Sequence, residues 1–167
     1  VKFHDGSTFD AADAKASLER VIDTKTGAAG RANLSTITSM VAEGRSLTLN
    51  LSVPNVPILA ALDGVNMAML SSDDIAAGKV GGSNKPNGTG PYKFVSWEPT
   101  QSVKYVSNPG YWMGAPKITN LTIRVIPNES SILSAMNAGT IQFGIVTDPL
   151  IAKQISTKSL KLFKVPA

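Results

Sequence analysis

The chain has 167 residues, of which 43% are hydrophobic and 17% charged, a composition typical of a folded soluble domain with one core or two small lobes. No apolar run approaches the roughly 18 residues that a membrane-spanning helix needs, and the basic residues behind the net charge of +4 are scattered singly, so we expect neither membrane insertion nor nucleic-acid binding. With no cysteine and one histidine, the chain offers no disulfide or thiolate metal site, and we expect no cofactor.

The first half of the chain changes from a helical to an alternating pattern of hydrophobic residues. A helical stripe behind a capping Asp10 predicts a helix over about Ala11–Asp23. Alternation on both sides of a turn at residues 43–45 predicts a β-hairpin over residues 37–53. Its buried face is expected to carry Leu47, Leu49 and Leu51. The next predicted elements are a short helix over 56–64, a strand over 65–72, a short helix capped by Ser72, and a loop over 79–87.

The second half mixes another hairpin with alternating strands and helices. Strands over 92–98 and 102–108 flank a turn at Pro99-Thr100. The further predicted elements are a strand over 118–126, a helix capped by Asn128 and ended by Gly139, a strand over 140–146, a helix capped by Asp148, and a last strand over 160–165. Hairpins combined with strand-helix-strand units predict an α/β, or mixed α+β, fold with parallel and antiparallel strand pairs.

The segment Asn87-Gly88-Thr89-Gly90-Pro91 has the glycine content of a phosphate-binding loop, but a strand pattern follows it. A phosphate loop needs the N-terminus of a helix behind its glycines, where N–H groups and the helix dipole face the anion. We therefore interpret the segment as a tight turn into a strand. In this interpretation Gly88 and Gly90 permit unusual backbone angles. Pro91 lies at an edge or first-strand position, where no backbone N–H is needed to donate a hydrogen bond to a neighbouring strand.

His4, Asp5 and Ser7 contain the three residue types of a hydrolase triad. They lie so close together in one predicted turn that they cannot take triad roles without other partners, and one imidazole cannot build a metal cluster. The simpler interpretation is that the His4 side chain closes the turn before the first helix. A hydrolase-type enzyme is therefore kept as an alternative, while we expect no enzyme.

Four stretches, in the same order along nearly the whole chain, resemble the extracytoplasmic solute-binding proteins of peptide- and nickel-type ABC importers. They are VKFHDGSTFDAADAKASLERV, GTGPYKFVSWEP, NPGYWMGAPKITNLTIRVIPNESSILSAMNAGTI and LKLFKVPA. Two positions depart from the family pattern. Asp10 stands where relatives often have Thr, which preserves helix capping, and Gln142 stands where they often have an acidic residue, which removes a charge.

The resemblance implies a lobe of the periplasmic-binding-protein type II kind, one of two lobes that close on a ligand. It implies that residues 1–167 are part of lobe one, with an inserted subdomain over about residues 10–86 and strands and helices returning toward the hinge over 87–167. It also implies a monomeric protein, periplasmic or otherwise extracytoplasmic, that captures peptides or similar small solutes for the membrane permease of an ABC importer. A lipid anchor on the full-length protein stays open, as does a non-transport sensor or chaperone on the same scaffold.

The candidate ligand-binding residues within the chain are Asn66, Met67 and Met69, in the strand predicted over 65–72. An amide and adaptable methionine side chains suit a variable ligand. The alternative is that these residues serve ordinary sheet packing. The resemblance implies that the charged groups that grip peptide ends lie largely in the other lobe, so no such residue is assigned here.

Overall fold

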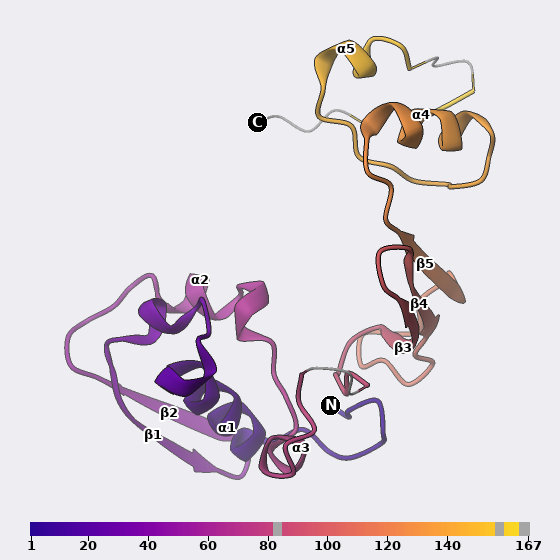
Figure 1. The fold of residues 1–167 in the computed structure, drawn as a ribbon. Helices are drawn as coiled ribbons and strands as arrows, with labels where there is room; N and C mark the ends of the chain where they lie inside the picture. The colour runs from indigo at the N-terminus through magenta and orange to yellow at the C-terminus, as the bar shows by residue number, and fades with distance from the viewer. Residues whose placement is uncertain (82–84, 156–158, 164–167) are drawn as a thin grey trace. The chain divides into compact units, whose positions relative to one another are not determined.

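The computed structural model describes residues 1–81, 85–155 and 159–163. It has the predicted mixed α/β composition and divides into two compact units. Unit 1 contains Val1–Ser96 and Lys104–Leu121, and unit 2 contains Trp97–Val103 and Thr122–Ala167. Figure 1 shows helix α1 and the β1–β2 hairpin, which belong to unit 1, and helices α4 and α5, which belong to unit 2.

Helix α1, Ala11–Ile22, begins at a capping box and confirms the first predicted helix. The Asp10 carboxylate accepts hydrogen bonds from the backbone N–H groups of Ala12 and Asp13 at 2.8 and 3.4 Å. The Asp13 carboxylate in turn accepts a hydrogen bond from the backbone N–H of Asp10 at 3.0 Å. These bonds satisfy donors that a helix start leaves without partners, so they set the residue at which the helix begins.

The Asp13 carboxylate also ties α1 to helix α3, Ser72–Ala76. Asp13 is only 5% exposed, and it accepts hydrogen bonds from both the backbone N–H and the hydroxyl of Ser72, each at 2.8 Å. Burial by itself raises the pKa of Asp13, but the hydrogen bonds from Ser72 and Asp10 outweigh burial and lower the pKa below its usual value. A charged carboxylate therefore holds together two helices from distant parts of the sequence.

The core of unit 1 forms where α1 packs on the hairpin of strands β1, Ile37–Glu43, and β2, Ser46–Leu51 (Figure 1). The two strands are antiparallel, with Met40 opposite Leu49. The buried side chains of this core are Leu18, Val21, Leu34 and Met67. The inward-facing leucines of β2 are half-buried, and this confirms the predicted hairpin and its buried face.

Short elements connect this core to the rest of unit 1. They are 3₁₀ helices η1, Thr24–Thr26, and η2, Arg31–Leu34, helix α2, Ile58–Leu62, and 3₁₀ helix η3, Val65–Met67. Helix α2 confirms the predicted short helix. Helix α3 begins one residue earlier than predicted, because the Ser71 hydroxyl, not that of Ser72, caps it by accepting a hydrogen bond from the N–H of Asp74 at 3.4 Å.

The predicted strand over residues 65–72 is wrong. The N–H of Met67 donates a hydrogen bond to the carbonyl of Gly64 at 2.9 Å and closes η3, from which the Met67 side chain enters the core. Gly30 makes room for that side chain, since a Cβ atom on Gly30 would lie 2.5 Å from the Met67 Cε. Burying Met67 in the core from a tight turn therefore stabilises this segment more than the strand that its alternating pattern favours.

A three-stranded sheet contains β3, Tyr92–Glu98, β4, Ser102–Ser107, and β5, Asn120–Arg124, in the order β3-β4-β5. The turn between β3 and β4 places Thr100 at a φ of 62° and confirms the second hairpin. Hydrogen bonds from the N–H of Ser107 to the carbonyl of Thr119, and from Val125 to Gln101, show that β4 and β5 are antiparallel. Within the described residues every strand pair is antiparallel, so the parallel part of the prediction is not found there.

Unit 2 contains helices α4, Glu129–Asn137, and α5, Pro149–Ala152, whose predicted caps Asn128 and Asp148 are confirmed. Gly139 follows α4 at a φ of 70°, a conformation that favours glycine and ends the helix as predicted. The Glu129 carboxylate links the start of α4 to the segment before α5, because it accepts hydrogen bonds from Thr147 and from the N–H of Asp148. The Thr147 hydroxyl is the main reason that the pKa of Glu129 lies below its usual value.

Two strands predicted in unit 2 do not form. Residues 140–146 follow α4 without pairing to any strand of the described residues, so that prediction is wrong. Residues 160–163 are not a strand either, and residues 164 and 165 of the same prediction lie outside the described residues. An alternating pattern identifies a chain that can enter a sheet, but a strand requires a neighbour to pair with.

Candidate functional site

Two stretches that are far apart in the sequence meet in unit 1, namely His4-Asp5 and the glycine-containing segment 87–91. The N–H of His4 donates a hydrogen bond to the carbonyl of Gly88 at 2.8 Å. The His4 ring accepts a hydrogen bond at Nδ1 from the N–H of Gly88 at 3.4 Å, and its Nε2 lies 3.0 Å from the carbonyl oxygen of Gly90. A carbonyl can only accept, so the tautomer that makes both contacts has its N–H at Nε2.

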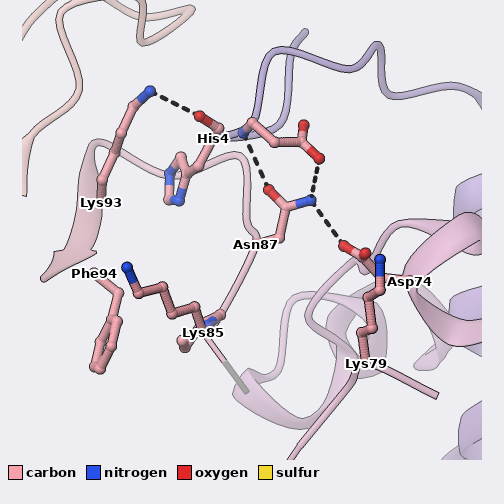
Figure 2. Close-up of a pocket in the computed structure, with 9 residues that line it drawn as sticks. His4, Asp74, Lys79, Lys85, Asn87, Lys93 and Phe94 are labelled. Carbon is pink, nitrogen blue, oxygen red and sulfur yellow. Dashed lines mark hydrogen bonds between the residues drawn. The ribbon is translucent and has the colours of Figure 1, made fainter. Parts of the chain in front are cut away.

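Asn87 extends this junction to helix α3 (Figure 2). Its side-chain nitrogen donates hydrogen bonds to the carboxylates of Asp5 and Asp74, each at 2.8 Å, and its oxygen accepts one from the N–H of Asp5 at 3.3 Å. Asp5 also accepts hydrogen bonds from the hydroxyl and the N–H of Ser7, at 2.7 and 2.9 Å. The Ser7 hydroxyl is the main cause of a lowered pKa of Asp5.

These contacts confirm that segment 87–91 leads into strand β3 instead of a helix. The explanation offered for its glycines is wrong, because neither Gly88 nor Gly90 has a positive φ. Gly88 lies against His4, where an added Cβ would be 3.7 Å from the ring carbon Cε1, and Gly90 would meet nothing within 4 Å. The N–H of Gly88 is used by His4, so it is not presented to an anion.

A pocket of about 410 Å³ opens beside this junction (Figure 2). Its lining residues are His4, Asp5, Asp74, Lys79, Lys85, Pro86, Asn87, Lys93 and Phe94. Lys93 is anchored, since its ammonium donates a hydrogen bond to the carbonyl of His4 at 2.8 Å. The two lining carboxylates are engaged by Asn87, so the groups left to act on a bound molecule are the exposed Lys79 and Lys85 and the Phe94 ring. Such a lining can attract an anionic group.

The residues of the hydrolase alternative do not form a triad. The Ser7 hydroxyl donates its hydrogen bond to Asp5 and not to His4, while both ring nitrogens of His4 are directed at backbone groups of residues 88 and 90. In a triad the nucleophile donates its hydrogen bond to the imidazole, and the described structure shows no such bond between Ser7 and His4. The simpler interpretation of His4 is wrong as well, because its ring bonds to Gly88 and Gly90 of the distant segment 87–91. The turn before α1 is closed by the backbone, where the N–H of Phe3 donates to the carbonyl of Ser7 at 2.9 Å.

The structure places the three candidate ligand-binding residues on or just after η3. Asn66 is exposed, Met67 is only 4% exposed within the core, and Met69 packs partly buried against the same core. Only Asn66 therefore presents its side chain to solvent. A role in ligand binding stays a prediction for all three residues.

Three exposed large apolar residues in the same stretch of sequence as Asn66 were missed by the sequence reasoning. Val56, Leu59 and Val65 lie in or beside α2 and η3, and they are 89, 75 and 92% exposed. Short helices carry too few residues for periodicity to separate a buried from an exposed side chain. The prolines at positions 54 and 57 were the available signal, because they shorten the local elements and place these side chains in connecting structure.

Comparison with known proteins identifies the family. Over residues 1–167 the chain matches the middle part of the bacterial extracellular solute-binding proteins, family 5. The chain belongs to this family. The resemblance inferred from the four sequence stretches is therefore confirmed, and the stretches around His4 and Asn87 that carried it are the ones that meet in the structure.

Relatives of this family 5 chain bind different small solutes. The glutathione-binding protein GsiB of Pectobacterium atrosepticum is 32% identical over 149 residues, which are 86% of this chain and 28% of GsiB. AgaA of A. tumefaciens R10, solved with agropinic acid, is 29% identical with a TM-score of 0.80, over 84% of this chain and 29% of AgaA. The ABC transporter-associated periplasmic binding protein DppA of Helicobacter pylori, solved with the peptide STSA, is 26% identical with a TM-score of 0.72, over 84% of this chain and 32% of DppA.

The family 5 chain thus spans about three tenths of the length of the curated relatives it matches. Its fold agrees with the solved family members over most of its own length, which confirms the predicted type of lobe. In the described residues no helix combines the length and the apolar character needed to cross a bilayer.

Proposed function

We propose that this chain is part of the substrate-binding component of an ABC importer, which captures peptides or similar small solutes outside the cell membrane. The observation that carries the proposal is the match to the family along the whole of residues 1–167. It is supported by relatives named for binding glutathione, agropinic acid and a peptide. The protein works as a binding protein and not as an enzyme, and its partner is a membrane permease.

The proposed mechanism is burial of the solute between two lobes, of which residues 1–167 supply part of one. Each wall of such a cleft contributes some of the contacts, and closure is favourable only when both walls touch the solute. Residues 10–86 form an inserted subdomain of this lobe and residues 87–167 return toward the hinge. The chain by itself therefore binds solutes weakly.

Asn66 is the residue that we propose faces the solute. Its amide is exposed and follows the exposed Val65 in η3, and small-molecule sites combine apolar surface with a few such polar groups. Met67 and Met69 act beneath it, because their packing against the core holds η3 in place. The polar groups around His4 and Asn87 are already bonded to one another, which suits a structural junction better than a solute site.

Calorimetry tests this function. The full-length parent protein and the 167-residue chain are titrated with the same panel of di-, tri- and tetrapeptides, glutathione and an opine. We expect the parent to bind at least one of them with a micromolar or lower Kd, about −8 kcal/mol or better, and the chain to show no binding at that level. Submicromolar binding by the chain alone contradicts the two-wall mechanism, and failure of the parent to bind any solute contradicts the function.

The sensor alternative predicts solute binding without transport. Uptake of the identified solute is measured in the source cells with and without the parent gene. Loss of uptake on deletion supports import, whereas binding with unchanged uptake favours a sensor.

A further inference from the structure

The pocket beside the junction of His4 and Asn87 is large enough for an organic molecule. Its volume of about 410 Å³ lies in the range of roughly 300–1,000 Å³ that small-molecule pockets occupy, whereas one water molecule fills about 30 Å³. All of the lining residues belong to unit 1. The walls of the pocket therefore come from one compact unit.

The lining carries more ammonium than carboxylate groups. Lys79, Lys85 and Lys93 stand against Asp5 and Asp74, so one positive charge is left over when the histidine is counted as neutral. In the part of the chain that the structure describes, no carboxylate lies within 4.0 Å of any of the three ammonium groups. A cleft with an excess of one charge attracts ions of the opposite sign, so the lining favours an anion.

The two kinds of charge are separated within the pocket. Both lining carboxylates accept hydrogen bonds from the side-chain nitrogen of Asn87. In the view of Figure 2, Asp74 lies on one side of Asn87. On the other side the figure shows Lys85, Lys93 and Phe94. An anion on that second side meets two ammonium groups and an aromatic ring, away from the carboxylate of Asp74.

These three side chains indicate the chemical class of the ligand. Lys93 is held in place by its hydrogen bond to the carbonyl of His4 at 2.8 Å, and its ammonium has two more N–H groups to donate. Lys85 is exposed, and among the described residues its ammonium has no hydrogen-bond acceptor. The half-buried Phe94 ring packs edge-to-face on Tyr105, with the ring centroids 6.3 Å apart. A carboxylate matches the one excess positive charge, and an apolar group attached to it matches the ring.

We propose that this pocket is a second binding site, for a small organic acid whose carboxylate lies between the ammonium groups of Lys85 and Lys93 and whose apolar part contacts Phe94. The bonded groups around Asn87 form a fixed wall of the site and do not themselves hold the acid. The site is additional to the solute site proposed at Asn66, and it does not rest on the proposed function.

Lysine labelling read by mass spectrometry tests the site in the full-length parent protein. The parent is acetylated with a limiting amount of an activated ester at constant ionic strength, with benzoate as the probe, with its neutral analogue benzamide, or with neither. Benzoate at twice its Kd or above should slow the labelling of Lys85 by about threefold or more, and benzamide should leave it unchanged. The exposed Lys117 is the internal control and should be labelled equally in all three samples.

Calorimetry on variants of the parent identifies the groups that hold the probe. Lys85→Gln should raise the Kd for benzoate by about tenfold, because a hydrogen bond between charged groups is lost, whereas Lys117→Gln should leave it unchanged. Acetate, which lacks the ring, should bind more weakly than benzoate by about threefold or more. Asn66→Ala should not change the benzoate Kd, since Asn66 belongs to the other site.

Each measurement has an outcome that contradicts the proposal. Labelling of Lys85 that benzoate slows no more than that of Lys117, or no more than benzamide does, overturns the carboxylate site, and so does an unchanged Kd in Lys85→Gln. Equal binding of acetate and benzoate overturns the apolar contact. Weaker benzoate binding in Asn66→Ala shows that the acid occupies the solute site and overturns the second site. None of these measurements uses a transported solute, so a parent that binds benzoate here but no solute refutes only the proposed function.

Discussion

Replacement of Asp13 tests how the first helix is held in unit 1. The carboxylate is 5% exposed and accepts three hydrogen bonds, from the N–H and hydroxyl of Ser72 at 2.8 Å each and from the N–H of Asp10 at 3.0 Å. A hydrogen bond to a charged group contributes about 1.5–3 kcal/mol, and the three share one carboxylate, so they are not additive. We expect Asp13→Ala to lower the free energy of unfolding by about 2–4 kcal/mol.

Asp13→Asn separates the two sides of this contact. The amide oxygen can still accept from Ser72, but the amide nitrogen faces the N–H of Asp10, and two donors cannot bond to each other. The expected loss is about 1–2 kcal/mol, roughly half that of the alanine variant. Urea unfolding followed by circular dichroism measures both, with Asp63→Ala at an exposed position as the control.

The pH dependence gives an independent check on Asp13. Its pKa is lower in the folded chain than the ordinary 3.8, so the stabilisation is complete above that value and is lost as the pH falls through the folded pKa. The difference in stability between the natural chain and Asp13→Asn should therefore shrink between about pH 5 and pH 2. If Asp13→Ala destabilises no more than Asp63→Ala, or if the difference does not change with pH, the carboxylate does not join α1 to α3 as described.

Three further predictions concern other contacts. Gly144→Ala should destabilise unit 2 by about 1–3 kcal/mol in urea unfolding, because its Cβ would meet Ile132 at 2.5 Å, whereas Gly90→Ala should be nearly neutral because nothing lies within 4 Å; equal effects would contradict the close approach to α4. His4→Ala should lower the free energy of unfolding by about 1–2 kcal/mol and speed hydrogen exchange of the Gly88 N–H, which donates a hydrogen bond to His4. Unchanged exchange would show that this bond does not form in solution. In the parent, Asn66→Ala should raise the solute Kd at least about threefold in calorimetry with unchanged thermal stability, and an unchanged Kd removes Asn66 from the proposed site.

The junction around His4 shows how far sequence reasoning reached toward the site. His4, Asp5 and Ser7 form no triad, as expected, because triad roles need geometry that one turn does not supply. The interpretation of His4 as the side chain that closes its own turn is wrong, since the ring bonds to the distant segment 87–91. The partner of His4 could not be found in the same way. His4 and Gly90 are separated by 86 positions, and no local pattern indicates which distant carbonyl a ring will meet.

Three of the helix caps and the two hairpins were determined by the sequence itself. Asp10, Asn128 and Asp148 bond to N–H groups two or three residues away, and the turns at residues 43–45 and 99–101 join strands that are neighbours in the chain, so all the necessary partners are local. The tertiary structure decided where alternating segments became strands. Residues 65–72 gave up their alternating pattern to bury Met67, and residues 143–146 alternate between exposed and half-buried side chains without a strand of the described residues beside them. A helix satisfies its backbone from within, whereas a strand depends on hydrogen bonds from another part of the chain, and that dependence is why the two classes of prediction fared so differently.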